Sequence, residues 1–317
     1  MWHNGVLGLA SAAAVIGMAA PPADARARAA VPVSALVVNV GTGGTLYADS
    51  AARVRPPASL TKMMTMYLAF EAMATGRLKP TTAITISRAA ARQPASRLGI
   101  AAGKSLSARD ALGVIAVDSA NDVTVALAEA LAGSEKRFVQ QMNTKAQQLG
   151  MRNTHFANAT GLRDRGNRTT ARDMARLSLA LIRRYPARYA YFSTRKVTWK
   201  TRVMRNHNHL LGTVPGVDGI KTGYTVDAGY NLAASAKRDG KRILVIVLGA
   251  RTAAARDARV ANLLELGFAP SIAKPGPSRD HAATHHRANR AAASRRAAVT
   301  IASQGDRAVP PHRDGRD

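Results

Sequence analysis

The sequence predicts an α+β fold, in which strands from both ends of the chain form one antiparallel β-sheet and the segments between them form a helical subdomain. Short apolar segments bounded by glycine-rich or charged turns lie near both ends of the chain. The intervening segments carry apolar residues at helical spacing and have capping residues at their starts. With 317 residues, of which 46% are hydrophobic, the chain can bury a sizeable core.

Five segments are expected to form strands. They are residues 34–40, 45–49, 217–225, 229–236 and 242–248. The first two flank residues 41–44 (GTGG), and the last two flank residues 237–240 (KRDG). Glycine and Asp-Gly suit hairpin turns because these turns require a positive φ angle. Both pairs are therefore expected to be antiparallel hairpins.

Five helices are expected between the strands. They cover residues 60–74, 107–117, 121–132, 135–149 and 170–185. Ser107 and Thr170 are each followed three residues later by aspartate, a pattern that resembles a capping box. Gly76 and Gly150 provide stop signals, and Pro186 ends the last helix.

Both ends of the chain differ in composition from the central body, residues 31–268, which we expect to be one catalytic domain. The apolar, small-residue run in residues 1–25, followed by an Ala-x-Ala site, predicts a signal peptide and export to the periplasm or cell envelope, although Lys and Arg are missing before the run. Residues 269–317 contain few large apolar residues and are expected to be a disordered basic tail. They lack the apolar face of an amphipathic membrane anchor.

The chain is strongly basic and contains no cysteine. It has 46 Lys and Arg residues against 19 Asp and Glu residues, a formal net charge of +27. The lack of cysteine excludes disulfides, thiolate catalysis and thiolate metal sites. The charge would attract nucleic acid, an anionic membrane or acidic wall polymers, and does not by itself distinguish among them.

A Ser-x-x-Lys pattern occurs where the first predicted helix begins. If the helix starts near Ser59, Lys62 lies one turn further on the same face. A serine hydroxyl needs a base to become a nucleophile, and an amine serves when burial or nearby positive charge lowers its pKa. The free N–H groups of a helix start can stabilise an oxyanion. Taken alone, the pattern also fits a helix-capping serine and a solvated lysine.

Two further patterns lie downstream. Ser119 and Asn121 stand two residues apart between two predicted helices, where a hydroxyl can relay a proton and an amide can bind a peptide backbone. The strand at residues 217–225 contains Lys-Thr-Gly, and its central glycine would let an extended peptide approach as an added strand. In isolation, these patterns equally describe a turn and a strand weakened by glycine.

Together the three patterns resemble the penicillin-recognising serine enzymes. Ser-x-Asn follows Ser-x-x-Lys by 60 residues, and Lys-Thr-Gly follows after another 102, in the order known for β-lactamases and penicillin-binding proteins. The stretches 57–65 (PASLTKMMT), 158–162 (NATGL) and 216–236 (GVDGIKTGYTVDAGYNLAASA) look like those of D-alanyl-D-alanine carboxypeptidases, the low-molecular-mass penicillin-binding proteins. The similarity covers roughly residues 32–268. It implies a β-lactamase/transpeptidase-like fold.

The resemblance also implies a reaction and its residues. Ser59, deprotonated by Lys62, would attack the terminal D-Ala-D-Ala bond of a peptidoglycan stem pentapeptide, and Ser119 would pass a proton to the departing D-alanine. The implied substrate-binding residues are Asn121, Lys221, Thr222, Gly223, Tyr224 and Arg256. Arg251 is the alternative to Arg256 for binding the terminal carboxylate. Water would hydrolyse the acyl-enzyme, β-lactams would acylate the same serine, and no cofactor or metal is expected.

Three alternatives share part of this pattern. A D,D-endopeptidase that cuts peptidoglycan cross-links would use the same residues. A class A β-lactamase needs a glutamate in a Glu-x-x-Leu-Asn pattern, which does not occur between Asn121 and Asp218. A nucleic-acid-binding protein would fit the charge, but only 4% of residues are aromatic, and helix-turn-helix, zinc-finger and aromatic-rich sheet patterns are missing. We therefore expect no nucleic-acid partner, and expect the charge to favour association with an anionic membrane or wall.

Overall fold

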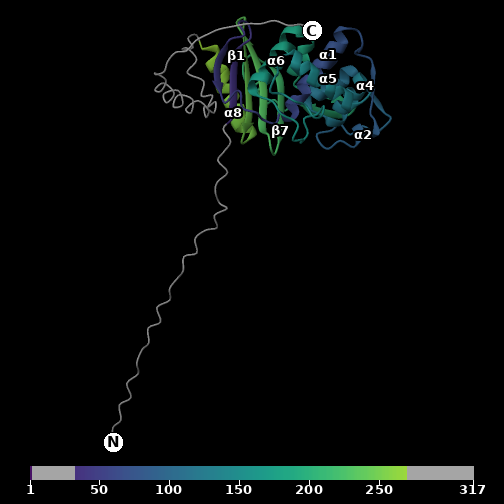
Figure 1. The fold of residues 1–317 in the computed structure, drawn as a ribbon, viewed down its shortest axis with the longest axis horizontal. Coiled ribbons are helices and arrows are strands. Elements are labelled where there is room, and N and C mark those ends of the chain that lie inside the picture. The colour runs from purple at the N-terminus through teal and green to yellow at the C-terminus, as the bar shows by residue number, and fades with distance from the viewer. Residues whose placement is uncertain (2–32, 270–317) are drawn as a thin grey trace, which may run out of the picture. The chain divides into compact units, whose positions relative to one another are not determined.

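The computed structural model describes Met1 and residues 33–269 (Figure 1). The predicted signal peptide and basic tail lie outside the described residues, apart from Met1 and Ala269. The strands are β1 (Ser34–Asn39), β2 (Thr45–Asp49), β3 (Ala83–Thr85), β4 (Ser105–Ser107), β5 (Lys196–Trp199), β6 (Arg202–Arg205), β7 (Val217–Thr225), β8 (Gly229–Arg238) and β9 (Lys241–Ala250). The helices are α1 (Lys62–Ala74), α2 (Arg88–Ala91), α3 (Ala108–Val117), α4 (Asn121–Ala132), α5 (Glu135–Gln148), α6 (Ala171–Arg184), α7 (Pro186–Tyr189) and α8 (Ala253–Phe268), with 3-10 turns η2 (Ala58–Thr61) and η3 (Ala190–Ser193).

Strands from both ends of the described chain form one five-stranded antiparallel sheet, so the predicted fold class is confirmed. The strand order is β2-β1-β9-β8-β7. The N-terminal strand β1 pairs with β9 from the other end, with Leu36 opposite Ile246. Strand β7 pairs with β8 and forms one edge of this sheet. An edge strand leaves backbone groups free to pair with a further strand.

The sheet buries both of its faces because successive side chains of a strand point to opposite sides. On one face, Leu36 and Ile246 belong to the larger core, which includes α1, α3 and α4. On the other face, Val37 and Val245 pack with Leu264 of α8 in a second core. Figure 1 shows α8 against the sheet, with α1, α4 and α5 grouped beyond β7.

The predicted caps occur at the starts of two helices. The hydroxyl of Ser107 accepts a hydrogen bond from the N–H of Asp110 at 3.1 Å, and that of Thr170 accepts one from Asp173 at 3.1 Å. Such caps satisfy N–H groups that have no partner inside the helix. They fix where α3 and α6 begin.

Helix α1 is buried almost throughout, and its methionines Met63, Met64 and Met66 are fully enclosed by the larger core. The buried residues of α1 lie on all of its faces, so it is a central helix rather than a surface helix. It therefore gives the 3-10 turn that precedes it a rigid support. Among the helices of the described part of the chain, none is long and apolar enough to cross a bilayer.

Candidate active site

Ser59 lies on the 3-10 turn η2, where the sequence predicted the start of an α-helix. The α-helix α1 begins only at Lys62. A 3-10 turn has three residues per turn, so positions three apart lie on the same side. The Nζ atom of Lys62 is accordingly 3.0 Å from the Oγ atom of Ser59. The turn thus brings the predicted nucleophile and base into hydrogen-bonding distance.

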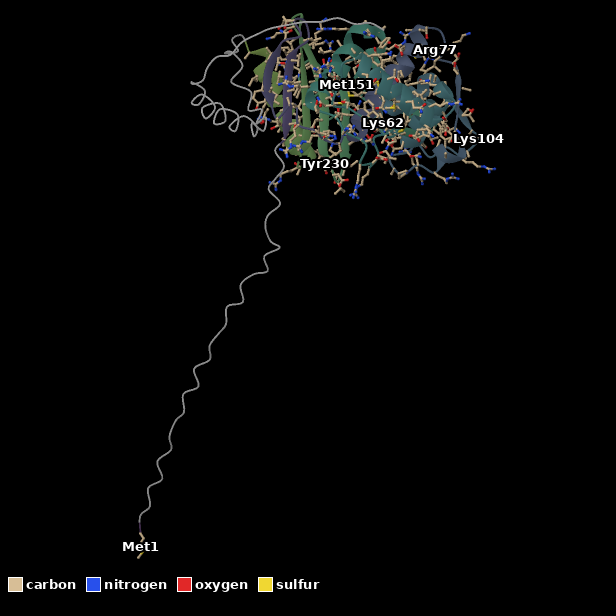
Figure 2. The ribbon with its side chains drawn as sticks, viewed as in Figure 1. Met1, Lys62, Arg77, Lys104, Met151 and Tyr230 are labelled. Atoms are coloured by element: carbon tan, nitrogen blue, oxygen red, sulfur yellow. The ribbon has the colours of Figure 1, made fainter. Side chains whose placement is uncertain are left out.

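Lys62 is fully buried and has two further partners. Its Nζ atom lies 2.8 Å from Oδ1 of Asn121 and 2.7 Å from the backbone oxygen of Thr160. Burial, and then the charge of Lys221, hold the pKa of the Lys62 amine well below its usual value. Figure 2 places Lys62 inside the molecule, whereas Lys104 extends from its edge.

The three contacts of Lys62 can accommodate the neutral amine that its lowered pKa favours. The oxygens of Asn121 and Thr160 can only accept hydrogen bonds, and a neutral amine has two N–H groups to donate to them. Its lone pair then remains for the hydroxyl proton of Ser59. The arrangement therefore suits removal of that proton by Lys62.

Ser119 lies in the turn between α3 and α4 and has a backbone φ of 62°, a region that residues other than glycine seldom occupy. Its Oγ atom is buried and has no hydrogen-bond partner in the described structure. Buried polar atoms normally have a partner, and strained residues of this kind often lie at functional sites. The hydroxyl of Ser119 is thus available to a bound molecule.

Asn121 begins α4, and both polar atoms of its side chain have partners within the protein. Its Nδ2 atom donates to the backbone oxygens of Pro94 at 3.0 Å and Ala95 at 3.1 Å, while Oδ1 accepts from Lys62. Asn121 therefore links Lys62 to the loop that contains Pro94. Its predicted contact with a substrate peptide stays a prediction.

Lys221 and Thr222 are both buried on β7. Desolvation lowers the pKa of Lys221 to about 7, with Asp118 acting in the opposite direction and Arg256 lowering it further. Among the described residues, its Nζ atom has one hydrogen-bond partner, the backbone oxygen of Thr222 at 3.2 Å. Asp118, directly before Ser119, was not selected by the sequence analysis, although an acid beside that motif is visible in the chain.

Gly223 is where β7 contacts the nucleophile turn, which is the 3-10 turn η2 that contains Ser59. A Cβ atom at this position would lie 2.9 Å from the backbone nitrogen of Ser59 and 3.1 Å from that of Leu60. Only glycine allows this approach without displacement. The next residue, Tyr224, is 52% exposed and its ring packs on Tyr230, with centroids 4.3 Å apart. The predicted part of Tyr224 in substrate binding stays a prediction.

Arg256, on α8, is 4% exposed. Its Nε and Nη2 atoms contact Oδ1 of Asp257 at 2.8 and 2.7 Å, and Oδ2 of Asp257 lies 3.1 Å from Nδ1 of His209. Its charge lowers the pKa of Lys221, so both cations belong to one electrostatic environment. Arg251, the alternative, is exposed. Asp257 and His209 could not be predicted from the sequence, because no motif marks them.

A loop at residues 158–162 completes the surroundings of Lys62. The hydroxyl of Thr65 on α1 donates to the backbone oxygen of Ala159 at 2.8 Å, which ties the loop to the helix. Gly161 has a φ of +79°, and a Cβ atom there would lie only 1.8 Å from the backbone oxygen of Ala58. The glycine therefore allows the loop to reach η2, and this brings the Thr160 oxygen to Lys62.

A buried lysine beside a serine, a second serine and a Lys-Thr-Gly edge strand are typical of serine enzymes that act through an acyl-enzyme. Residues 19–252 match the Peptidase_S11 family, described as D-alanyl-D-alanine carboxypeptidase. The chain belongs to this family.

Individual relatives agree with this assignment. The chain is 39% identical over 240 residues to the D-alanyl-D-alanine carboxypeptidase DacF of Bacillus subtilis, covering 74% of this chain and 61% of that protein. It is 36% identical over 239 residues to DacD of Escherichia coli, covering 73% of this chain and 62% of that protein. The chain thus spans about three fifths of the length of these relatives.

Solved structures share the fold. The D-alanyl-D-alanine carboxypeptidase DacD of Francisella tularensis superposes with a TM-score of 0.73 at 32% identity, covering 84% of this chain and 75% of that one. Penicillin-binding protein D2 of Listeria monocytogenes, in an ampicillin-bound form, has a TM-score of 0.69 at 36% identity, covering 74% and 97%. These similarities confirm the predicted penicillin-binding type of fold.

Proposed function

We propose that this protein is a serine-type D-Ala-D-Ala carboxypeptidase that removes the terminal D-alanine from peptidoglycan stem pentapeptides. The observation that carries the proposal is the 3.0 Å contact between Nζ of the buried Lys62 and Oγ of Ser59. The named activity of the relatives supports the same reaction.

In the proposed acylation, the Ser59 oxygen attacks the carbonyl carbon of the last peptide bond while Lys62 takes its proton. The backbone N–H groups of Ser59 and Tyr224 stabilise the oxyanion. As the C–N bond breaks, the proton passes from Lys62 through Ser119 to the nitrogen of the departing D-alanine. Water then hydrolyses the ester, which restores Ser59 and releases the shortened peptide.

In the proposed complex, Lys221, Thr222 and Arg256 bind the terminal carboxylate of the substrate. Charge-assisted hydrogen bonds to a carboxylate are stronger than neutral ones. The substrate lies along the free edge of β7, where Gly223 keeps the strand close to Ser59, and Asn121 orients its backbone. A β-lactam acylates the same serine, in agreement with the ampicillin-bound form of the Listeria relative.

We also propose that the protein is exported and works in the cell envelope. The apolar N-terminal run supports export, and a formal net charge of +27 supports attraction to an anionic membrane or wall. Both features fit a substrate that lies outside the cytoplasm.

The test is D-alanine release from a stem pentapeptide, with a cross-linked peptide dimer measured in parallel. We expect release from the pentapeptide by the wild type and loss of that release in Ser59→Ala. Faster cleavage of the dimer would instead assign the endopeptidase activity. A folded wild type that acts on neither substrate would refute the proposed enzyme function.

A further inference from the structure

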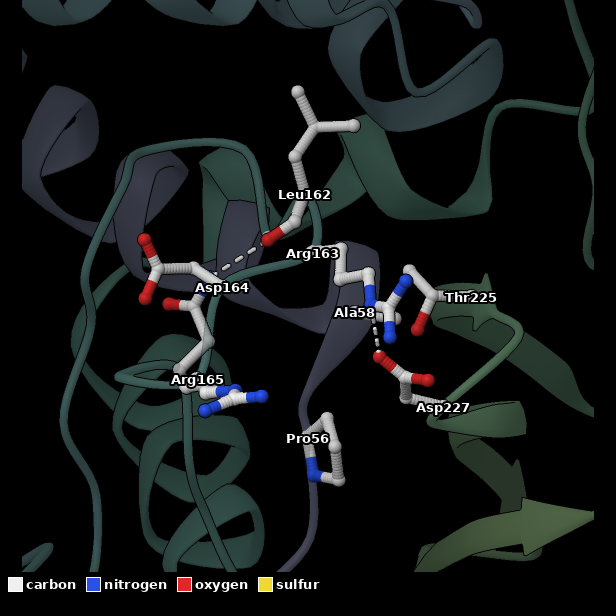
Figure 3. A pocket seen from close by; sticks show the side chains of 10 residues that line it. Pro56, Ala58, Leu162, Arg163, Asp164, Arg165, Thr225 and Asp227 are labelled. Atoms are coloured by element: carbon white, nitrogen blue, oxygen red, sulfur yellow. Dashed lines mark hydrogen bonds and ion pairs between the residues drawn. The ribbon is translucent and has the colours of Figure 1, made fainter.

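Beside the nucleophile turn lies a cavity of about 610 Å³ that the reaction does not use (Figure 3). One wall is the loop at residues 161–167, a second is formed by Pro56 and Ala58, and a third is the end of β7 with Thr225 and Asp227. Because Ala58 directly precedes Ser59, the cavity is adjacent to the proposed acylation site. A pocket of this size holds a long side chain.

The direction of the proposed substrate leads into this cavity. Lys221 and Thr222 would bind the terminal carboxylate, and the Tyr224 N–H would bind the carbonyl one residue upstream. The preceding part of the stem peptide therefore continues along β7 past Tyr224, toward Thr225 and Asp227, which line the cavity.

Charged groups stand on opposite sides of the cavity. Arg163 forms an ion pair with Asp227 that joins the loop to the turn after β7, and both side chains are exposed. Exposed ion pairs contribute little stability, so a ligand can replace one partner at low cost. Arg165 lies on the other side in Figure 3 and has no polar partner among the described residues.

The loop is held in place by its own polar side chains. Asn167 is buried, donates from Nδ2 to the backbone oxygen of Leu162 at 2.9 Å, and accepts from the N–H of Ala157 at 2.8 Å. The carboxylate of Asp164 accepts the N–H of Gly166 at 2.7 Å. Asn167 and the Oδ1 atom of Asp164 are thus used within the loop, whereas among the described residues Arg165 has no polar partner and Asp227 pairs only with Arg163.

We infer that this cavity binds the side chain of the residue before D-Ala-D-Ala, and that it selects a side chain ending in both an ammonium and a carboxylate group. Arg165 binds the carboxylate, and Asp227 shares its charge between Arg163 and the ammonium. A cation and an anion facing each other across one cavity match such a zwitterionic end. This inference rests on the proposed carboxypeptidase function.

The test compares two pentapeptides that differ only in the third residue, diaminopimelate with both end groups or lysine with the ammonium alone. We expect the wild type to release D-alanine from the diaminopimelate peptide with a kcat/KM about tenfold higher, the usual order for one charge-assisted contact. Arg165→Gln is expected to remove this preference by slowing the diaminopimelate peptide alone, and Arg165→Lys to retain part of it.

Two controls separate the cavity from the reaction itself. Arg137→Gln, an exposed arginine on α5 that does not line the cavity, is expected to keep the preference. Acylation by penicillin is expected to be equal in all variants. If the wild type has the same kcat/KM on both peptides, or if Arg165→Gln lowers kcat/KM equally on both, the inference is overturned. The proposed function is not affected by either result. A folded wild type that neither releases D-alanine nor is acylated by penicillin would overturn the proposed function and the inference with it.

Discussion

At the scale of single residues, Lys62 determines what the site can do. Its amine is fully buried between Ser59 and two oxygens that only accept hydrogen bonds, and Lys221 adds a second buried positive charge nearby. Both burial and like charge favour the neutral amine. A lysine that would hold its proton tightly in water is thereby suited to the role of base that we propose for it.

Replacing Lys62 by alanine is expected to slow acylation of Ser59 by about 10²–10⁴-fold, the usual contribution of a general base. Stopped-flow measurement with a reporter penicillin gives this rate. Lys104→Ala, which changes an exposed lysine, serves as the matched control. A Lys62→Ala variant that acylates at the wild-type rate would exclude Lys62 as the base.

Two limbs of the pH dependence follow from the roles that we propose for Lys62 and Lys221. Acylation requires neutral Lys62, so its rate rises with pH through the lowered pKa of this amine. Carboxylate binding requires charged Lys221, whose pKa is about 7, so KM rises as the pH increases above that value and the proton is lost. Lys221→Met should have a higher KM that no longer depends on pH in this range. A wild-type KM that is constant from about pH 6 to 9 would be incompatible with this role.

The residues of the site could be predicted from the sequence only as far as side-chain identity carries the signal. The contact of Lys62 with Ser59 followed from a spacing of three residues. The contact with the backbone oxygen of Thr160 did not, because any residue has a carbonyl and only the fold brings this one to Lys62. For the same reason, the link from Asn121 to the backbone of Pro94 was not visible.

At the scale of elements, two close approaches of backbone hold the site together. Strand β7 reaches η2 at Gly223, and the loop at residues 158–162 reaches it at Gly161. The nucleophile turn is therefore enclosed between a strand and a loop, with the buried helix α1 behind it. Ser59 is placed by backbone packing rather than by contacts of its own side chain alone.

Gly161→Ala is expected to destabilise the fold by about 2–4 kcal/mol, because it adds a clash to the cost of a left-handed backbone. Gly103→Ala is the matched control, with a similar φ of +82° but no atom within 4 Å of the added Cβ, and should cost only about 1–2 kcal/mol. Urea unfolding measures both. Equal losses of unfolding free energy in the two variants would show that the close approach of Gly161 to Ala58 does not affect stability.

Most long elements with clear end signals were predicted, whereas the short strands and the long helix α8 were not. The hairpin between β8 and β9 and the caps of α3 and α6 follow from turn and capping residues. Strands β3 to β6 have only three or four residues each, too few to show an alternating pattern. Helix α8 was not predicted, although Thr252 caps it by accepting the N–H of Ala255 at 3.0 Å.

At the scale of the whole molecule, the excess of positive charge is expected to act on location rather than on catalysis. A formal net charge of +27 is expected to bind the protein to anionic lipid vesicles at low ionic strength. Raising the salt to about 1 M shortens the screening length to about 3 Å and should release it. Sedimentation with anionic and neutral vesicles measures this. Binding that is insensitive to salt, or equal for both vesicles, would argue against an electrostatic origin.

Mass spectrometry after incubation with penicillin tests whether Ser59 forms the acyl-enzyme. We expect the wild type to gain the mass of one penicillin, carried by the peptide that contains Ser59. Ser59→Ala, shown to be folded by circular dichroism, should gain none. An adduct on another residue, or no adduct on folded wild type, would contradict the claim.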